Sequence, residues 1–140
     1  MRKSILLTAA MLAGAALVGA QPPLRDPVEV EAVGLKAVIN DGRVILTWKR
    51  YKRDDFSSYK LVKSQTNAKP VFPDDPVIFY GDAPGELRFE DGKLAIGTWH
   101  YRLCIITRFG DRWVSPVATV SIGPEDVKRA APTSADFEGP

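Results

Sequence analysis

Residues 99–106 read WHYRLCII, and this stretch decides the fold that the sequence predicts. Large apolar side chains alternate with other residues along it, and such alternation is typical of a β-strand with two different faces. The large side chains are Trp99, Tyr101, Leu103 and Ile105. We expect this set to point into a core, which leaves Arg102, Cys104 and Ile106 on the opposite face.

Short segments with the same period of two recur on both sides of this stretch. They cover residues 28–33, 44–48, 59–62, 77–80, 87–90 and 113–122. Turn-forming residues separate them, as in Asn40-Asp41-Gly42 and Asp91-Gly92. Many short strands with turns between them, and no helical period, predict an all-β sandwich.

Several of these stretches resemble a fibronectin type III domain, over most of residues 34–122. They are Val44–Trp48 (second strand), Asp55–Val62 (entry to the third), Phe89–Thr98 (approach to the E–F corner), Trp99–Ile105 (sixth strand), and Gly110 with Ser115-Pro116 (last turn and strand). The resemblance implies a seven-stranded antiparallel immunoglobulin-like β-sandwich. Members of this family mostly serve as binding modules or spacers.

The register around the E–F corner has two solutions. The family usually places a tyrosine there, and counting from Leu94 puts His100 at that position. Alternation instead turns Trp99 and Tyr101 inward. We favour the alternation, because a slip of one residue would expose both aromatic side chains.

The first twenty residues predict a cleavable signal peptide. Arg2 and Lys3 precede an apolar, Ala-rich run, and small residues end with Ala20 at the expected cleavage point. The alternative is an uncleaved membrane anchor. Cleavage would leave no stable membrane span and would place the chain in the periplasm or outside the cell.

The rest of the chain divides into three parts. Residues 21–27 hold three prolines and predict an extended linker. Residues 28–122 form the fibronectin type III-like domain, and residues 123–140 predict a disordered tail. Of the 19 basic residues, two lie in the signal peptide, so 17 remain against 17 acidic ones. A neutral chain argues against a nucleic-acid partner.

Catalytic and metal-binding patterns are weak. The single His100 and the single Cys104 lie on one face of a strand, about 13 Å apart, which is too far for a nucleophile and its base. One His and one Cys do not make a zinc site. We expect Asp74, Asp75 and Asp82 to be solvated loop residues, and we expect no cofactor.

The face opposite the core is the first candidate for a partner surface. It would carry Lys60, Val62, Arg102, Cys104 and Ile106. An exposed Cys104 would also allow a disulfide-linked dimer. The Pro-rich loop at residues 67–76 is expected to cross between the sheets and to contribute to binding. The alternative is a central strand that is apolar on both sides, with this face partly covered by the tail or linker.

A basic cluster after Trp48 is the second candidate. Lys49, Arg50, Lys52 and Arg53 would form a patch for phosphate, an anionic polysaccharide or lipid headgroups. The alternative is a solvated loop in which Asp54 and Asp55 neutralise half of this charge.

Together these features predict an exported, non-enzymatic binding, adhesion or scaffold module. It would act through a sandwich face or its loops on a protein or cell-envelope component. The alternative is an accessory or inhibitor protein that docks onto an exported enzyme or secretion component.

Overall fold

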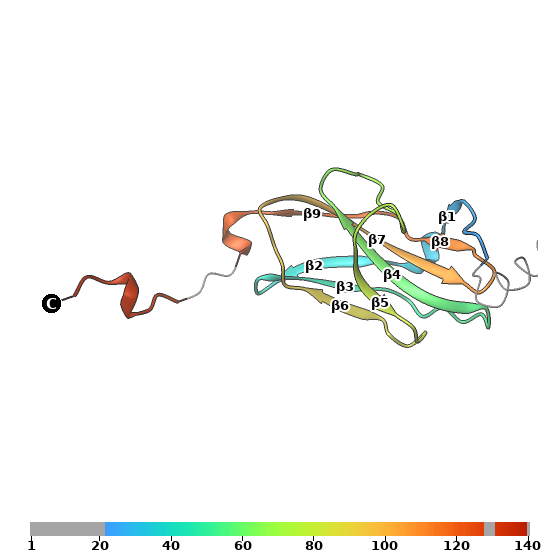
Figure 1. Ribbon diagram of the computed structural model, residues 1–140, viewed down its shortest axis with the longest axis horizontal. Coiled ribbons are helices and arrows are strands. Elements are labelled where there is room, and N and C mark those ends of the chain that lie inside the picture. The colour runs from blue at the N-terminus through green and yellow to red at the C-terminus, as the bar shows by residue number, and fades with distance from the viewer. Residues whose placement is uncertain (1–21, 128–130, 140) are drawn as a thin grey trace, which may run out of the picture.

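The computed structural model describes residues 22–127 and 131–139, and this part of the chain is all-β (Figure 1). Two sheets face each other, joined by turns and loops. The helical turns in the described ranges are 3-10 turns of three residues: η1 (Glu31–Val33), η2 (Pro124–Asp126) and η3 (Ser134–Asp136). None of the described helices is long and apolar enough to cross a membrane. The predicted signal peptide lies outside the described residues.

The larger sheet is built around one long strand, β7. Its strands are β1 (Pro27–Glu29), β4 (Phe56–Ser64), β5 (Val77–Gly81), β7 (Gly97–Thr107), β8 (Arg112–Val114) and β9 (Ala118–Ile122). They lie in the order β1-β8-β7-β4-β5, and β9 also pairs with β7. β7 is buried on both faces from Tyr101 to Thr107, because one face lies against the main core and the other packs in a second apolar cluster.

The smaller sheet has the order β2-β3-β6, with β2 (Lys36–Asn40), β3 (Arg43–Thr47) and β6 (Arg88–Asp91). The turn between β2 and β3 holds Asp41 and Gly42, both with positive φ (50° and 75°). This is the backbone that a tight hairpin needs, and it confirms the turn predicted from Asn40-Asp41-Gly42.

The main core lies between the two sheets. Its members include Val44, Leu46 and Trp48 from the small sheet side, and Tyr59, Leu61, Tyr101, Leu103 and Ile105 from the large sheet. Trp48 packs edge-on against Tyr59, with ring centroids 5.8 Å apart. The predicted inward set of β7 therefore faces the core.

Alternation also gives the correct register after the corner between β6 and β7, which corresponds to the predicted E–F corner. Tyr101 is fully buried, and its hydroxyl donates a hydrogen bond of 2.7 Å to Asp91 at the end of β6. Lys63 donates to the same Asp91 carboxylate at 2.7 Å. His100 points away from the core and lies 3.0 Å from the Thr119 hydroxyl. Tyr101, and not His100, ties this corner.

Two details differ from the predicted sandwich. The described ranges hold nine strands, and β1 pairs with β8 in parallel, so the large sheet is mixed. The last predicted strand is split into β8 and β9 because the register with β7 shifts by one residue at Ser115-Pro116. There the Ser115 hydroxyl accepts a hydrogen bond from the Leu103 N–H at 3.0 Å, and Pro116 has no N–H to donate to β7.

The segments flanking the predicted domain pack against it. The supposed linker lies along the turn before β8, where the Arg25 N–H donates to the Gly110 carbonyl at 2.8 Å. Gly110 has a φ of 86°, and a Cβ there would lie 2.3 Å from the Pro23 carbonyl oxygen. At the other end, Val127 packs against the core, so the domain continues past residue 122. Residues 131–139 are exposed.

Candidate functional site

The face of the large sheet opposite the core, called here the outer face, is not a free surface. Val62 and Cys104 are fully buried, and Ile106 and Arg102 are 8% and 7% exposed. Lys60 is half-buried. Val62, Cys104, Ile106 and Val114 form a second, smaller apolar cluster. Alternation placed these side chains on one face correctly, but the expectation that the face is exposed is wrong.

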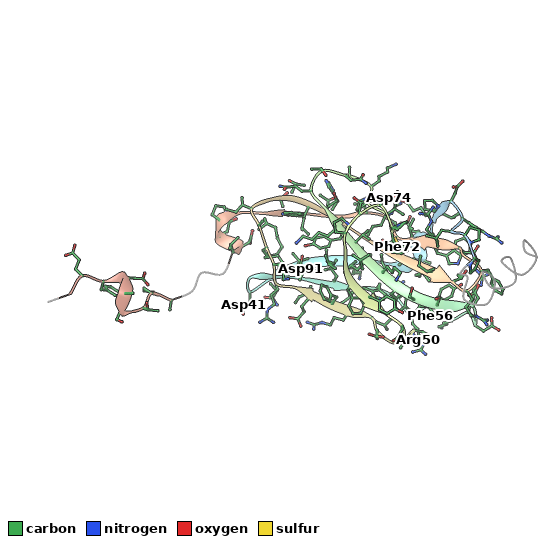
Figure 2. The ribbon with its side chains drawn as sticks, viewed as in Figure 1. Asp41, Arg50, Phe56, Phe72, Asp74 and Asp91 are labelled. Carbon is green, nitrogen blue, oxygen red and sulfur yellow. The ribbon has the colours of Figure 1, made fainter. Side chains whose placement is uncertain are left out.

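The loop at residues 65–76 covers this face. It joins β4 to β5, which pair in the same sheet, so it does not cross between the sheets as expected. Instead it folds back, and Phe72 and Val71 pack on the outer cluster (Figure 2). Asp75 holds the loop in shape by accepting hydrogen bonds from the Val71 N–H at 2.9 Å and the Asn67 amide at 3.0 Å.

Cys104 has no access to a partner chain in this fold. Its side chain is buried and unpaired, and burial raises the pKa of the thiol. A disulfide-linked dimer requires an exposed thiol, so the structure removes the basis for that prediction, and we do not propose it.

One opening remains on the outer face, beside Lys60. The Lys60 ammonium lies between two rings, 4.8 Å from the centroid of Phe72 and 4.2 Å from that of Tyr80. Burial lowers the pKa of this amine. Lys60 and Ile106 line a hollow of about 390 Å³ there, together with serine hydroxyls and the N-terminal segment.

The other polar residues singled out by the sequence do not converge. Asp74 and Asp82 are exposed, and Asp75 serves the loop fold. No cluster of three metal-ligating side chains occurs among the residues that the structure describes. His100 and Cys104 share one face of β7 and have separate surroundings.

The basic cluster lies at what we call the loop end of the domain, where the loop at residues 48–55 meets the turn between β7 and β8 (Figures 1 and 2). The loop is firmly held. The Arg108 N–H donates to the Asp55 carbonyl at 2.8 Å. The Tyr51 N–H donates to the Tyr59 hydroxyl at 3.0 Å, and the Tyr51 hydroxyl donates to the Asp55 carboxylate at 2.6 Å. Burial and this carboxylate raise the pKa of Tyr51.

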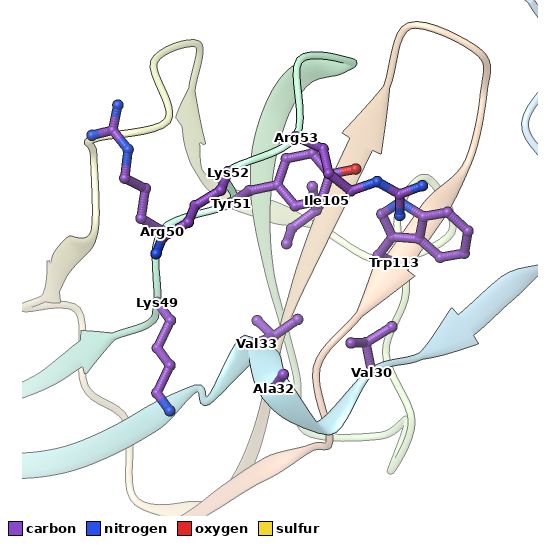
Figure 3. Close-up of a pocket in the computed structure, with 10 residues that line it drawn as sticks. All are labelled: Val30, Ala32, Val33, Lys49, Arg50, Tyr51, Lys52, Arg53, Ile105 and Trp113. Carbon is purple, nitrogen blue, oxygen red and sulfur yellow. The ribbon is translucent and has the colours of Figure 1, made fainter.

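A cavity of about 400 Å³ opens at the loop end, and we call it the basic cavity (Figure 3). Its apolar wall comes from three distant segments: Val30, Ala32 and Val33 around η1, Ile105 on β7 and Trp113 on β8. Its remaining lining is the run Lys49 to Arg53. The volume lies within the roughly 300–1,000 Å³ typical of small-ligand pockets.

The four cations at this cavity are exposed, and none of them forms an ion pair in the part of the chain that the structure describes. Neither aspartate of this loop forms an ion pair with these cations. The Asp55 carboxylate is buried and accepts a hydrogen bond from the Tyr51 hydroxyl, whereas Asp54 is exposed and accepts from Arg108, at 2.9 Å, through its backbone carbonyl. The cavity therefore has a positive rim without a paired counter-charge.

The rim cations are spread around the opening. The Lys49 stem runs over Gly34, where φ is 65° and a Cβ would lie 3.3 Å from Lys49 Cε. Arg50 reaches the turn before β6, against Gly85. Arg53 and Trp113 both line the cavity (Figure 3). The Trp113 Nε1 is buried and makes no hydrogen bond of ordinary geometry among the described residues, although the indole lies close enough to the Tyr51 hydroxyl to offset part of the rise in the pKa of that tyrosine.

The fold and this cavity define a small all-β domain of two facing sheets with one basic, apolar-walled opening. No family model and no curated protein matches the chain. The solved structures to which it is similar include two pectate lyases and one fibronectin type III domain. Pectate lyase Pel3 from Pectobacterium carotovorum has a TM-score of 0.50 and 16% identity over 71% of this chain and 28% of that chain. Pectate lyase PelI from Erwinia chrysanthemi, in complex with tetragalacturonic acid, has a TM-score of 0.49 and 17% identity over 61% of this chain and 27% of that chain.

The third structure is the sixth fibronectin type III domain of human fibronectin type III domain containing protein 3. It has a TM-score of 0.49 and 17% identity over 79% of this chain and 94% of that one. The chain spans little more than a quarter of each pectate lyase. At these identities the likenesses concern the fold alone.

Sequence reasoning found the rim of the basic cavity and missed its wall. Lys49 to Arg53 are contiguous, so composition reveals them. Val30, Ile105 and Trp113 come from separate strands that only the fold brings together. The sequence places Trp113 in the last predicted strand, and no local signal distinguishes its role as a cavity wall.

Proposed function

We propose that this protein is an exported, non-enzymatic binding module of fibronectin type III type, and that it binds an anionic ligand at the basic cavity. The observation that carries the proposal is the set of four unpaired cations around one apolar-walled cavity. Uncompensated like charges at one opening are unfavourable for the free protein and favourable for an anionic partner.

The fibronectin type III type is supported by the strand arrangement. Counting β8 and β9 as one interrupted strand and β1 as an addition gives seven strands, divided between sheets β2-β3-β6 and β5-β4-β7-β8/β9. The non-enzymatic role is supported by the site, because neither His100 nor Cys104 lines the cavity. Export is supported by the pattern of the first twenty residues.

The test is retention of the exported chain on immobilised polyanions bearing carboxylate, phosphate or sulfate groups. The variant Arg50→Gln, Lys52→Gln, Arg53→Gln should elute at clearly lower salt than the natural protein, because exposed charge contacts are screened by ions. The matched control is Lys36→Gln, Lys69→Gln, Lys93→Gln, which removes three exposed cations elsewhere. The control should elute like the natural protein; equal loss in both variants would mean that net charge alone drives retention and would refute the proposal.

A further inference from the structure

The basic cavity is lined unevenly, and this unevenness says more about its ligand than charge does. The cations stand at the mouth, whereas the wall is formed by aliphatic and aromatic side chains, among them Val30, Val33 and Ile105 (Figure 3). A hydrated inorganic anion gains little from such a wall, since apolar surfaces favour contact with apolar groups over water. The lining instead matches a molecule with an apolar body and a charged head.

The head position is marked by the cations at the mouth. Arg53 lines the cavity, is exposed and forms no ion pair among the described residues. The Trp113 Nε1 is buried, so a ligand in the opening does not reach it. A guanidinium suits a carboxylate, sulfonate or phosphate head, with which it forms charge-assisted hydrogen bonds.

The part of the lining formed by Tyr51 is already fixed in place. Tyr51 is held by hydrogen bonds to Tyr59 and Asp55, and its ring stacks near Phe56, with centroids 6.2 Å apart. The Asp55 carboxylate is occupied by Tyr51, so it does not compete for Arg53. A preformed wall lets a ligand bind without first ordering the loop.

We propose that the ligand of the basic cavity is an amphiphilic anion, with its apolar body against Val30, Val33 and Ile105 and its head at Arg53 on the rim. This inference rests on the proposed function, since it specifies the ligand of the same site. The shared chemistry is an anionic head on an apolar body, found both in free amphiphiles and in anionic lipids.

The experiment uses anilinonaphthalene sulfonate as the probe and N-phenyl-naphthylamine as its analogue without the sulfonate. Saturable fluorescence enhancement by the natural chain is expected for the sulfonate, with the uncharged analogue at least about tenfold weaker. Arg53→Gln should weaken sulfonate binding by about tenfold and leave the analogue unchanged. Equal affinity for both probes would overturn the inference.

The variant Ala32→Trp separates this inference from the proposed function, because it fills the cavity and keeps every cation. It should abolish saturable probe binding while elution from the polyanion columns stays unchanged. Ala95→Trp, at an exposed position elsewhere, should bind the probe normally. If Ala32→Trp binds the probe as well as the natural chain, the amphiphile inference is wrong even when the columns support an anion site. If the natural chain and the triple rim variant elute alike from the columns, the proposed function itself is wrong.

The source of the amphiphile is then resolved by competition. Displacement of the probe by decanoate would show that a free amphiphile is sufficient for binding at the cavity. Sedimentation of the natural chain, but not of Ala32→Trp, with phosphatidylglycerol vesicles identifies the lipid form. Either result supports the inference; the absence of both probe displacement by decanoate and sedimentation with the vesicles refutes it.

Discussion

The sequence marks both the outer face and the loop end as candidate binding surfaces. In the structure the outer face is largely covered, whereas the loop end opens into a cavity. On the outer face, apolar residues at alternate positions suggested a surface for a partner, yet Phe72 and its loop cover them. At the loop end, a run of cations predicted an anion-binding patch or a solvated loop, and these exposed residues border a cavity with an apolar wall. The comparison teaches that alternation reveals which way a side chain points, while what lies above it depends on segments far away in sequence.

The strongest way to break this comparison is to place a negative charge in each region. Val62→Asp buries a carboxylate without a partner, so the free energy of unfolding should fall by about 3–5 kcal/mol. Lys52→Asp lies on the surface and should change it by less than about 0.5 kcal/mol. Urea unfolding followed by tryptophan fluorescence measures both. Similar losses in the two variants would show that the outer face is not a packed cluster.

A second prediction concerns the cover itself. Phe72→Ala should cost about 1–3 kcal/mol, less than for a fully buried phenylalanine because Phe72 is half-buried. It should also speed the labelling of Cys104 by a thiol reagent under native conditions, since the loop no longer shields the thiol. Phe109→Ala removes an exposed ring at the loop end and is the matched control. Labelling that stays as slow as in the natural chain would contradict the covering role.

The smallest predicted effect is on pH dependence. The pKa of Cys104 is raised above 9.0 by burial, so the folded state holds its proton more tightly than the unfolded state. The resulting stability is fully present below about pH 9 and is lost as pH rises through the folded pKa, at up to about 1.4 kcal/mol per pH unit.

Denaturation midpoints from pH 8 to pH 10 would show this fall, and Cys104→Ala should flatten it in the same range. Above about pH 10 the tyrosines add to the loss, because burial also raises the pKa of Tyr59 and Tyr101. Removing Lys52 and Arg53 should leave the profile unchanged. An equally steep fall in Cys104→Ala would assign the effect to other groups.

Local pattern was enough to predict the strand character and the inward set of β7, because strand periodicity is set by the backbone alone. It also favoured Tyr101 over His100 correctly. It did not predict the parallel pairing of β1 with β8, which depends on where the N-terminal segment docks. The split at Ser115-Pro116 was visible as a proline, but only the register with β7 shows its consequence.

Of the candidate site, the sequence predicts the basic rim and misses the apolar wall. The cations of the cavity rim are neighbours in sequence, whereas the apolar wall is assembled from η1, β7 and β8. The Lys63–Asp91–Tyr101 network was missed because its members lie on three strands. Contacts between distant segments carry no local signature, and both the wall and the network consist of such contacts.

The docking of residues 22–29 along β8 has a practical consequence for orientation. These residues pack against the turn at Gly110, beside the loop end, whereas β9 and η2 leave the sheets at the opposite end (Figure 1). A support or fusion partner joined ahead of Pro22 would lie at the loop end, against the hollow beside Lys60 that Pro22 lines. Attachment after Val127 would hold the domain by its far end and present the mouth of the basic cavity outward, which makes the C-terminal side the natural handle for immobilisation.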